Sequence, residues 1–383
     1  GGENGFTGLF TRAFTDSTGN AGNLNIITNT LRVEDGAEVS ASTFGEGNSG
    51  SLNIDAQDIQ LIGGENGFTG LFASAESEST GDGGDLRINA NTLLVQNGAQ
   101  VSASTFGAGN GGNLIVNALD IQLIGGEAGS TGLFAQANSD STGDGGDLRI
   151  TTDTLQVENG ALVSVQNLNQ GVAGNLTINA DSIRLNDNAS ITANTRSNQS
   201  NSRTEQATIN INSRGLILGN GSRIRADARN SNVTGGNINI DSGVIAALEN
   251  SDISANSREG RGGNITIETQ GLFGTEVREQ PTPESDITAT GANELLVGNI
   301  EINGIVQNPV ETLTELPTAP VEGEFYDACQ VGEGENASEF YFVGTGGIPP
   351  SPLDLLQEES VYVGWVELPS GLEGGEGVEG VEG

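Results

Sequence analysis

The chain repeats a five-residue pattern, in which a glycine and a polar residue precede three residues whose first and third are apolar. The copies, the seventh of them degraded, begin at Gly22, Gly50, Gly84, Gly112, Gly146, Gly174, Ala207, Gly236, Gly263 and Gly298. Their spacings are 28, 34, 28, 34, 28, 33, 29, 27 and 35 residues. Self-similarity at a period of this size is typical of solenoids, in which each repeat buries its apolar face against its neighbours. The pattern therefore restricts the architecture before any single residue is considered.

Within a coil, apolar and polar residues alternate in three brief segments, residues 24–26, 31–33 and 39–43 in the first complete copy. Period-two alternation predicts β-strands with one face buried. Asx-Gly pairs follow the second segment, as at Asp35-Gly36 and Asn97-Gly98, and such pairs tolerate the positive φ of a tight turn. We therefore predict an all-β fold, a right-handed parallel β-helix of about ten coils with a short irregular C-terminal tail, because parallel crossovers are almost always right-handed.

Short and long coils alternate, and the decapeptide that starts at Gly1 recurs at Gly63, inside a long coil. We expect the chain to be the C-terminal fragment of a longer protein, because it begins in the middle of a coil. The long coils carry extra residues at one corner. We expect their aromatic side chains to form a stacked row that caps the core rather than a ligand groove. These are Phe6, Phe10, Phe68, Phe72 and Phe134.

The composition changes near the C-terminus, where the motif stops after its copy at Gly298 and all nine prolines lie at or beyond Pro281. Proline removes a ladder hydrogen bond, so regular stacking is expected to end there. The predicted organisation is a β-helix over 1–303, an acidic proline-rich linker over 304–323, a cap or tail segment over 324–369 and a disordered Gly/Glu-rich tail over 370–383.

Composition excludes several kinds of chemistry. The chain has 14 arginines, no lysine and 51 acidic residues, a net charge of −37 that argues against nucleic acid as a partner. It has no histidine and one cysteine, Cys329, which removes imidazole bases, histidine metal ligands and an intrachain disulfide. No apolar run is long enough for a transmembrane helix.

Three groups of polar residues were considered as sites. We interpret the polar residue after each motif glycine (Asn23, Asn113 and their equivalents) as a structural ladder. The sequences around Asp82 and Asp144 resemble the Gly-Asp repeat of calcium-binding β-rolls, but two copies 62 residues apart are not a tandem repeat. Candidates for polysaccharide chemistry are Asp181, Arg184, Asp187, Arg223, Arg225, Asp227 and Arg229. Surface pairing explains these charges more simply, and ten of the fourteen arginines, from Arg184 to Arg278, form a local positive band on an acidic rod. We therefore predict no enzyme activity, and we assign no catalytic, cofactor-binding or metal-ligating residue.

The repeated GGNLxI strand and the LxVxxGAxVSAST segment resemble the filamentous-haemagglutinin-like exoproteins of two-partner secretion. The resemblance covers the whole chain and includes the C-terminal sequence GTGGIPPSPLD from Gly344 to Asp354, although Thr345 stands where the family pattern has arginine. It implies a right-handed β-helix exported by an outer-membrane β-barrel partner through an N-terminal domain that this chain lacks. No functional residue of that family can therefore be carried over.

The expected function is that of an adhesin-like structural exoprotein, at the outer cell surface or extracellular, that contacts cell-surface carbohydrate or another surface ligand. Two alternatives stay open at this point. One is a carbohydrate-active β-helix enzyme, a polysaccharide lyase or hydrolase. The other is a passive spacer for an upstream domain.

Overall fold

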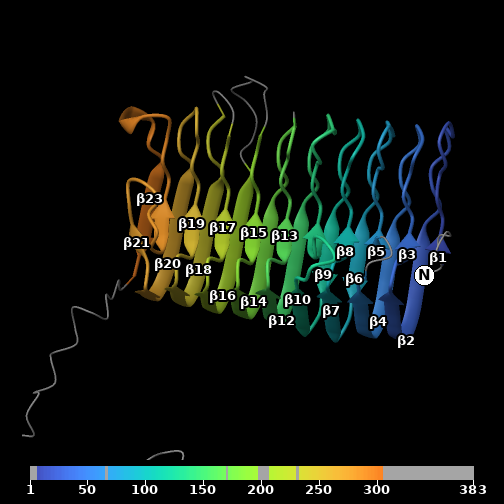
Figure 1. Cartoon of the computed structure of the whole chain (residues 1–383), viewed down its shortest axis with the longest axis horizontal. Helices are drawn as coiled ribbons and strands as arrows, with labels where there is room; N and C mark the ends of the chain where they lie inside the picture. The colour runs from blue at the N-terminus through green and yellow to red at the C-terminus, as the bar shows by residue number, and fades with distance from the viewer. Residues whose placement is uncertain (1–6, 65–67, 170, 197–206, 230–232, 305–383) are drawn as a thin grey trace, which may run out of the picture. The chain divides into compact units, whose positions relative to one another are not determined.

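The computed structural model describes residues 7–64, 68–169, 171–196, 207–229 and 233–304. These residues form a parallel β-solenoid of about nine turns, which confirms the predicted fold class (Figure 1). The ten copies of the repeated strand are separated by nine steps, so the predicted ten coils correspond to about nine complete turns. The described residues include one short 3₁₀ helix, η1 (Glu294–Leu296).

One of the two sheets, here called the long sheet, contains the repeated motif and is built from twelve strands. Its strands are β2 (Leu24–Glu34), β4 (Leu52–Ile62), β6 (Leu86–Asn89), β7 (Thr92–Gln96), β9 (Leu114–Asn117), β10 (Asp120–Ile124), β12 (Leu148–Glu158), β14 (Leu176–Asn186), β16 (Thr208–Leu218), β18 (Asn237–Ala247), β20 (Asn264–Phe273) and β23 (Asn299–Asn303). Equivalent motif residues are in register, as in the pairing of Leu24 with Leu52.

The second sheet, here called the short sheet, has eleven strands. Its strands are β1 (Thr7–Phe10), β3 (Ala37–Ser40), β5 (Thr69–Phe72), β8 (Ala99–Ser102), β11 (Gly132–Phe134), β13 (Leu162–Ser164), β15 (Ser190–Thr192), β17 (Arg223–Arg225), β19 (Asp252–Ser254), β22 (Asp286–Thr288) and β21 (Glu276–Val277). Except for β1, which is the first strand, and β22, which follows β21, each short strand follows a strand of the long sheet along the chain.

The prediction of three brief strands per coil is wrong, because the first two segments usually form one strand. In β2, β4, β12, β14, β16 and β18 the strand runs through eleven residues. Only two coils divide it, into β6 with β7 and β9 with β10. The polar residues between the two apolar segments do not interrupt the strand, because their backbone groups pair with the next coil across most of their length. In β12, for example, only Asp153 is skipped in the register with β14.

The turn between a long strand and the following short strand has the predicted chemistry. Asp35 and Gly36 have φ values of 53° and 80°, and Asn97 and Gly98 have values of 53° and 89°. Two consecutive residues with positive φ match the requirement for glycine, asparagine or aspartate at such a turn. In these coils the Asx-Gly pair therefore turns the chain from one sheet into the other.

After each short strand the chain enters a narrow excursion, here called the return arm, before it reaches the next long strand (Figure 1). Most of the arms are closed at their base by a backbone hydrogen bond, such as Gly50 N–H to the Ala41 carbonyl at 2.8 Å. Long coils differ from short ones in two places, not only at the predicted corner. The segment 63–68 replaces a two-residue turn, and the arm 73–85 is two residues longer than the arm 41–51.

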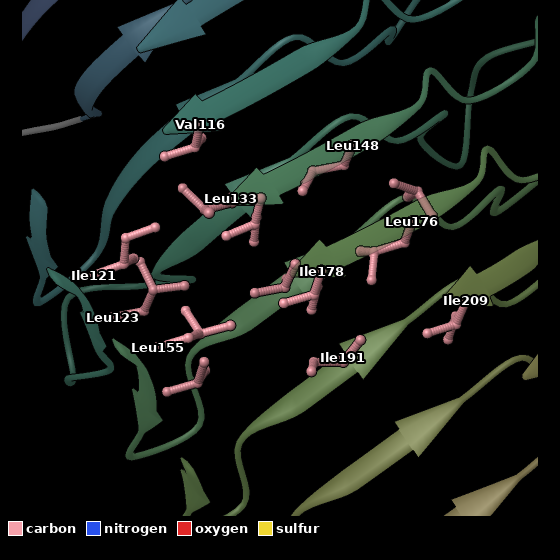
Figure 2. Close-up of a cluster of buried hydrophobic side chains, with 14 of the residues drawn as sticks. Val116, Ile121, Leu123, Leu133, Leu148, Leu155, Leu176, Ile178, Ile191 and Ile209 are labelled. Carbon is pink, nitrogen blue, oxygen red and sulfur yellow. The ribbon is translucent and has the colours of Figure 1, made fainter. Parts of the chain in front are cut away.

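The core fills the space between the two sheets. Figure 2 shows side chains of successive coils, among them Leu148 and Leu176, in contact along the stack. Inward residues of both sheets, such as Ile121 of the long sheet and Leu133 of the short sheet, are fully buried. Every interior coil therefore has apolar neighbours on both sides, which explains why a single repeat has no independent core.

The predicted stacked aromatic row is wrong. Phe10, Phe72 and Phe134 do occupy one column of the short sheet, but a serine holds that position in each short coil between them. Long and short coils alternate, so the rings lie two strands apart and cannot stack on one another. Phe68 is 71% exposed at its corner, and Phe6 lies outside the described residues.

The described strands end with β23 at Asn303. The predicted linker (304–323), apart from Gly304, together with the cap segment (324–369) and the tail (370–383), lies outside the described residues, and so does Cys329. These three assignments stay predictions.

Candidate functional site

The polar residue after each motif glycine forms a hydrogen-bonded ladder, as predicted. At five of the nine steps, the side-chain oxygen of one coil accepts the backbone N–H of the next. Asn23 Oδ1 accepts from Ser51 at 2.8 Å, and Asp85 Oδ1 accepts from Asn113 at 3.0 Å. The ladder satisfies backbone donors at the corner where each arm returns to the long sheet, so its role is structural.

A second ladder in the return arms contains the residues considered for calcium. Asp82 N–H donates to Asn48 Oδ1 at 2.9 Å, and Asp82 Oδ1 accepts from Asn110 N–H at 2.8 Å. Asn110 in turn accepts from Asp144 N–H at 2.9 Å. Asp82 and Asp144 are therefore two strands apart, about 10 Å along the stack, with an amide between them.

Calcium is bound by six to eight oxygen atoms at about 2.3–2.6 Å, which requires converging carboxylates. In the two ladders a neutral side chain separates each aspartate from the next, as Asn113 separates Asp85 from Asp147. Over the described part of the chain, no three acidic or cysteine side chains come together in a way that could hold a metal ion. The aspartates of the resembling Gly-Asp segments act there as hydrogen-bond acceptors for the backbone.

The enzyme candidates in the long sheet do not share a site. Asp181 forms an ion pair with Arg214 of the next coil, and both side chains are exposed. Arg184 lies 4.0 Å from Glu158 of the preceding coil. Asp187, with a φ of 53°, belongs to the turn after β14, where it accepts a hydrogen bond from the Asn186 amide.

The candidates in the short sheet do lie together. Arg223, Arg225 and Asp227 point away from the core at alternate positions on and just after β17. Arg223 Nε is 3.6 Å from Asp252 Oδ2. Asp227 accepts hydrogen bonds from Asn256 N–H at 2.8 Å and from Ser254 Oγ at 3.1 Å, and burial raises the pKa of its carboxyl. Both carboxylate oxygens of Asp227 therefore accept hydrogen bonds from the adjacent coil of the short sheet.

The most regular polar surface is the outer face of the first halves of the long strands, here called the asparagine face. It consists of two columns in register. The first column contains Asn25, Asn53, Arg87, Ile115, Arg149, Thr177, Asn210, Asn239, Thr266 and Glu301. The second contains Ile27, Asp55, Asn89, Asn117, Thr151, Asn179, Asn212, Asp241, Glu268 and Asn303.

Amides of this face form ladders along the rod. Asn53 Nδ2 donates to Asn25 Oδ1 at 2.9 Å, and Asn239 Nδ2 donates to Asn210 Oδ1 at the same distance. A side-chain amide has two N–H groups and two acceptor lone pairs, so a rung keeps capacity for further hydrogen bonds. The ladder fixes the orientation of each amide, and the remaining groups repeat at the strand spacing of about 4.8 Å.

Two shallow depressions lie on this side of the sheet. One, of about 440 Å³, lies over β14, β16, β18 and β20 and is lined by residues such as Asn179, Asn212 and Asp241. The other, of about 410 Å³, lies near the opposite end of the solenoid and is lined by Asp55 and Asn89 among others. Both are open surfaces rather than enclosed pockets, which suits a polymer lying along the rod better than a small molecule.

The asparagine face was not predicted, although the spacing of the inward residues in the sequence carries a signal for its shape. The inward residues Ile178 and Ile183 of β14 are five positions apart, and both are fully buried. A regular strand would place them on opposite faces. The strand must therefore change direction between them, and the polar residues before this bend form the asparagine face. The same five-residue step recurs in the other long strands.

A partly buried acidic group lies on the outer side of the short sheet, near the first coils. Arg12 forms an ion pair with Glu38 and lies 4.2 Å from the ring centroid of Phe10. Glu76 lies close by, at the position that Phe44 and Phe106 occupy in the adjacent coils. Burial raises the pKa of Glu76 to about 7, and the nearby Arg12 opposes that shift only in part.

We expect Glu76→Gln to stabilise the protein at alkaline pH. Because the folded-state pKa of Glu76 is raised from 4.5 to about 7, the folded state binds the proton more tightly than the unfolded state. Wild-type stability therefore falls as pH rises from about 4.5 to 7, and the carboxylate costs about 2–3 kcal/mol above that range. The variant lacks this loss and should be more stable by that amount at pH ~8, with a much smaller difference at pH ~4.

Urea unfolding at several pH values measures this effect, with Glu46→Gln, an exposed residue of the neighbouring arm, as the matched control. The control should have little effect on the free energy of unfolding at either pH. Equal pH profiles for wild type and Glu76→Gln would show that Glu76 titrates like an exposed carboxyl.

No family model matches the chain, and comparisons with curated proteins and with solved structures likewise found no match. Among the described residues, no helix has the length and apolar character that crossing a membrane requires.

Proposed function

We propose that this protein is a structural exoprotein of adhesin type, whose asparagine face binds neutral polysaccharide chains that lie along the rod. The observation that carries the proposal is the pair of columns that run from β2 to β23 and are polar at every position except Ile27 and Ile115. Amide and hydroxyl groups that repeat at the strand spacing match a linear ligand that offers hydroxyl groups at regular intervals.

The proposal includes export and display at the outer cell surface. Its support is the β-solenoid fold together with the resemblance of the GGNLxI repeats to exoproteins of two-partner secretion. An outer-membrane β-barrel partner would carry out the export. Antibody labelling of intact cells and of the culture medium tests this part, and we expect signal in at least one of them. Protein found only after cell lysis would contradict surface display.

We propose that the role is not catalytic. The acidic candidates Asp181 and Asp187 face different surroundings, and the open depressions of the asparagine face do not enclose a substrate. Catalysis by carboxylates requires a pair placed on either side of the bond to be cleaved. Incubation with a panel of polysaccharides should release neither reducing ends nor unsaturated products, and release of either would contradict this role.

Binding is tested with a double substitution in the larger depression. Asn179→Ala with Asn212→Ala removes two amides that are Cα partners in β14 and β16. Each lost hydrogen bond is worth about 0.5–1.5 kcal/mol, so retention on cellulose or dextran should fall by roughly tenfold.

The control is Gln122→Ala with Gln156→Ala. These two glutamines are register partners on β10 and on the half of β12 that follows the bend, outside the asparagine face. This variant should bind like wild type. Equal loss in both variants, or no retention of wild type on any neutral polysaccharide, would contradict the proposal and favour a passive spacer.

A further inference from the structure

Basic residues collect on the outer face of the short sheet over β15, β17 and β19. Arg223 pairs in register with Ser190 and Asp252, and Arg225 pairs with Thr192 and Ser254. The same face of the earlier coils carries serine and phenylalanine at the position of Arg225. The positive band that the sequence indicated is therefore concentrated, in part, on one face of a few adjacent coils.

Three more arginines continue this surface just beyond the strands. Arg196, Arg229 and Arg258 hold equivalent positions in consecutive coils, because their backbone N–H groups bond to the coil before at 3.0, 3.2 and 3.1 Å respectively. Their backbones therefore stack at the strand spacing of about 4.8 Å, and Arg229 and Arg258 are exposed. Together with Arg223 and Arg225 they form what we call the arginine face.

Two buried polar atoms at the centre of this face lack a hydrogen-bond partner. They are Nε of Arg225 and Oγ1 of Thr192, which belong to register partners on adjacent strands. A buried polar group left without a partner costs about 1–3 kcal/mol. Both atoms are shielded from solvent, so a ligand would contact this face first through the exposed guanidinium groups of Arg229 and Arg258.

The arginines are also only partly neutralised by the protein. Burial lowers the pKa of Arg225, the nearby carboxylates of Asp227 and Asp252 oppose that shift in part, and repulsion from Arg223 and Arg229 adds to it. The carboxylates nearest in sequence or space are Asp227, Asp252 and Glu259. Asp227 uses its oxygens within the sheet, while Asp252 faces Arg223. Among the residues that the structure describes, neither Arg229 nor Arg258 forms an ion pair, so this face carries positive charge on an otherwise acidic rod.

We propose that the arginine face binds a carboxylate-bearing polysaccharide, a polymer with one negative charge on each of its acidic sugars. Guanidinium groups bind carboxylates through paired hydrogen bonds, and the stacked arginines offer such contacts along the rod axis.

A denser polyanion fits this surface less well. The local positive excess is small, and the protein as a whole carries a net charge of −37, which repels closely spaced phosphates. Proteins that bind single-stranded nucleic acid combine positive charge with aromatic residues on which the bases stack. The aromatic column of this sheet, by contrast, ends at Phe134, two coils before β15.

The test is retention of the full chain on immobilised polygalacturonate at about 0.05 M and about 0.15 M salt. We expect wild type to bind and the added salt to weaken binding. Arg229→Gln with Arg258→Gln removes two exposed charges and should weaken binding by about tenfold, since each contact contributes on the order of 0.5–1 kcal/mol. Equal melting temperatures of variant and wild type would show that the fold is retained.

The matched control is Arg32→Gln with Arg184→Gln, two exposed arginines on the second halves of β2 and β14, outside both proposed binding faces, which changes the net charge by the same amount. It should bind polygalacturonate like wild type. Equal weakening by both double variants would overturn the proposal, because only net charge would then matter. So would absent binding of wild type at the lower salt concentration, or tighter binding of single-stranded DNA than of polygalacturonate.

Discussion

Replacing Gly112 by alanine is expected to destabilise the solenoid by about 3–5 kcal/mol, the largest effect that we predict for a single methyl group. A Cβ atom at this position would lie 2.1 Å from the Gly84 carbonyl oxygen and 2.5 Å from its carbon. Both are backbone atoms of the coil below, and they cannot move without breaking the strand spacing. The Gly112 N–H also donates to the Ala103 carbonyl at 2.7 Å, so the backbone is held from two sides.

Gly215→Ala is the matched control, because it makes the same chemical change in β16, where nothing lies within 4 Å of the added carbon. Its φ lies outside the left-handed region, so alanine should be neutral or stabilising by up to about 1 kcal/mol. Urea unfolding of the two variants measures the contrast. If Gly112→Ala were as stable as Gly215→Ala, the spacing between coils would not be what requires glycine in the motif.

Leu216→Ala is expected to cost about 2–5 kcal/mol, because it leaves a cavity in the core. Leu216 is fully buried and lies between Ile183 and Ile245 of the adjacent coils. Its neighbour Ile217 is 48% exposed, so Ile217→Ala should change the free energy of unfolding by about 0.5 kcal/mol or less. The two substitutions are adjacent in one strand, and urea unfolding of each reports which face is inward. Similar losses for both would contradict the assigned orientation of β16.

Much of the fold could be predicted because the repeat carries its own register. The apolar residues at the third and fifth positions of the motif were predicted to face inward. The structure buries them in the interior coils, as it does Leu114 and Val116. The Asx-Gly turns and the asparagine ladder were also predicted correctly, since both depend on local chemistry. The asparagine of one coil, such as Asn23, needs only the backbone of the next coil as its partner.

Predictions failed where the structure depends on which residue the neighbouring coil places at the same position, or on how its backbone pairs. The phenylalanines Phe10 and Phe72 looked like a continuous row, but a short coil lies between them and supplies Ser40. The two apolar segments of a long strand looked like separate strands, because the polar residues between them hide the continuous backbone pairing. In both cases the deciding information was the position of the neighbouring coil.

The candidate surfaces were less predictable than the fold. The sequence showed that arginines concentrate between Arg184 and Arg278, but it did not show which of them share a face. Arg229 and Arg258 are 29 residues apart and become adjacent only because successive coils stack in register. The asparagine face was missed because its residues alternate with core residues and read as ordinary solvent-facing positions.

The sequence by itself determined the solenoid, its inward rows and its turns, because each follows from a spacing or a residue type that repeats within every coil. Only the tertiary structure decided which outward side chains become neighbours, how the long strand bends, and why the motif begins with glycine. The physical reason is that coils stack about 4.8 Å apart. That distance places the Gly84 carbonyl where a side chain of Gly112 would begin, and it aligns amides and arginines that are far apart in the chain.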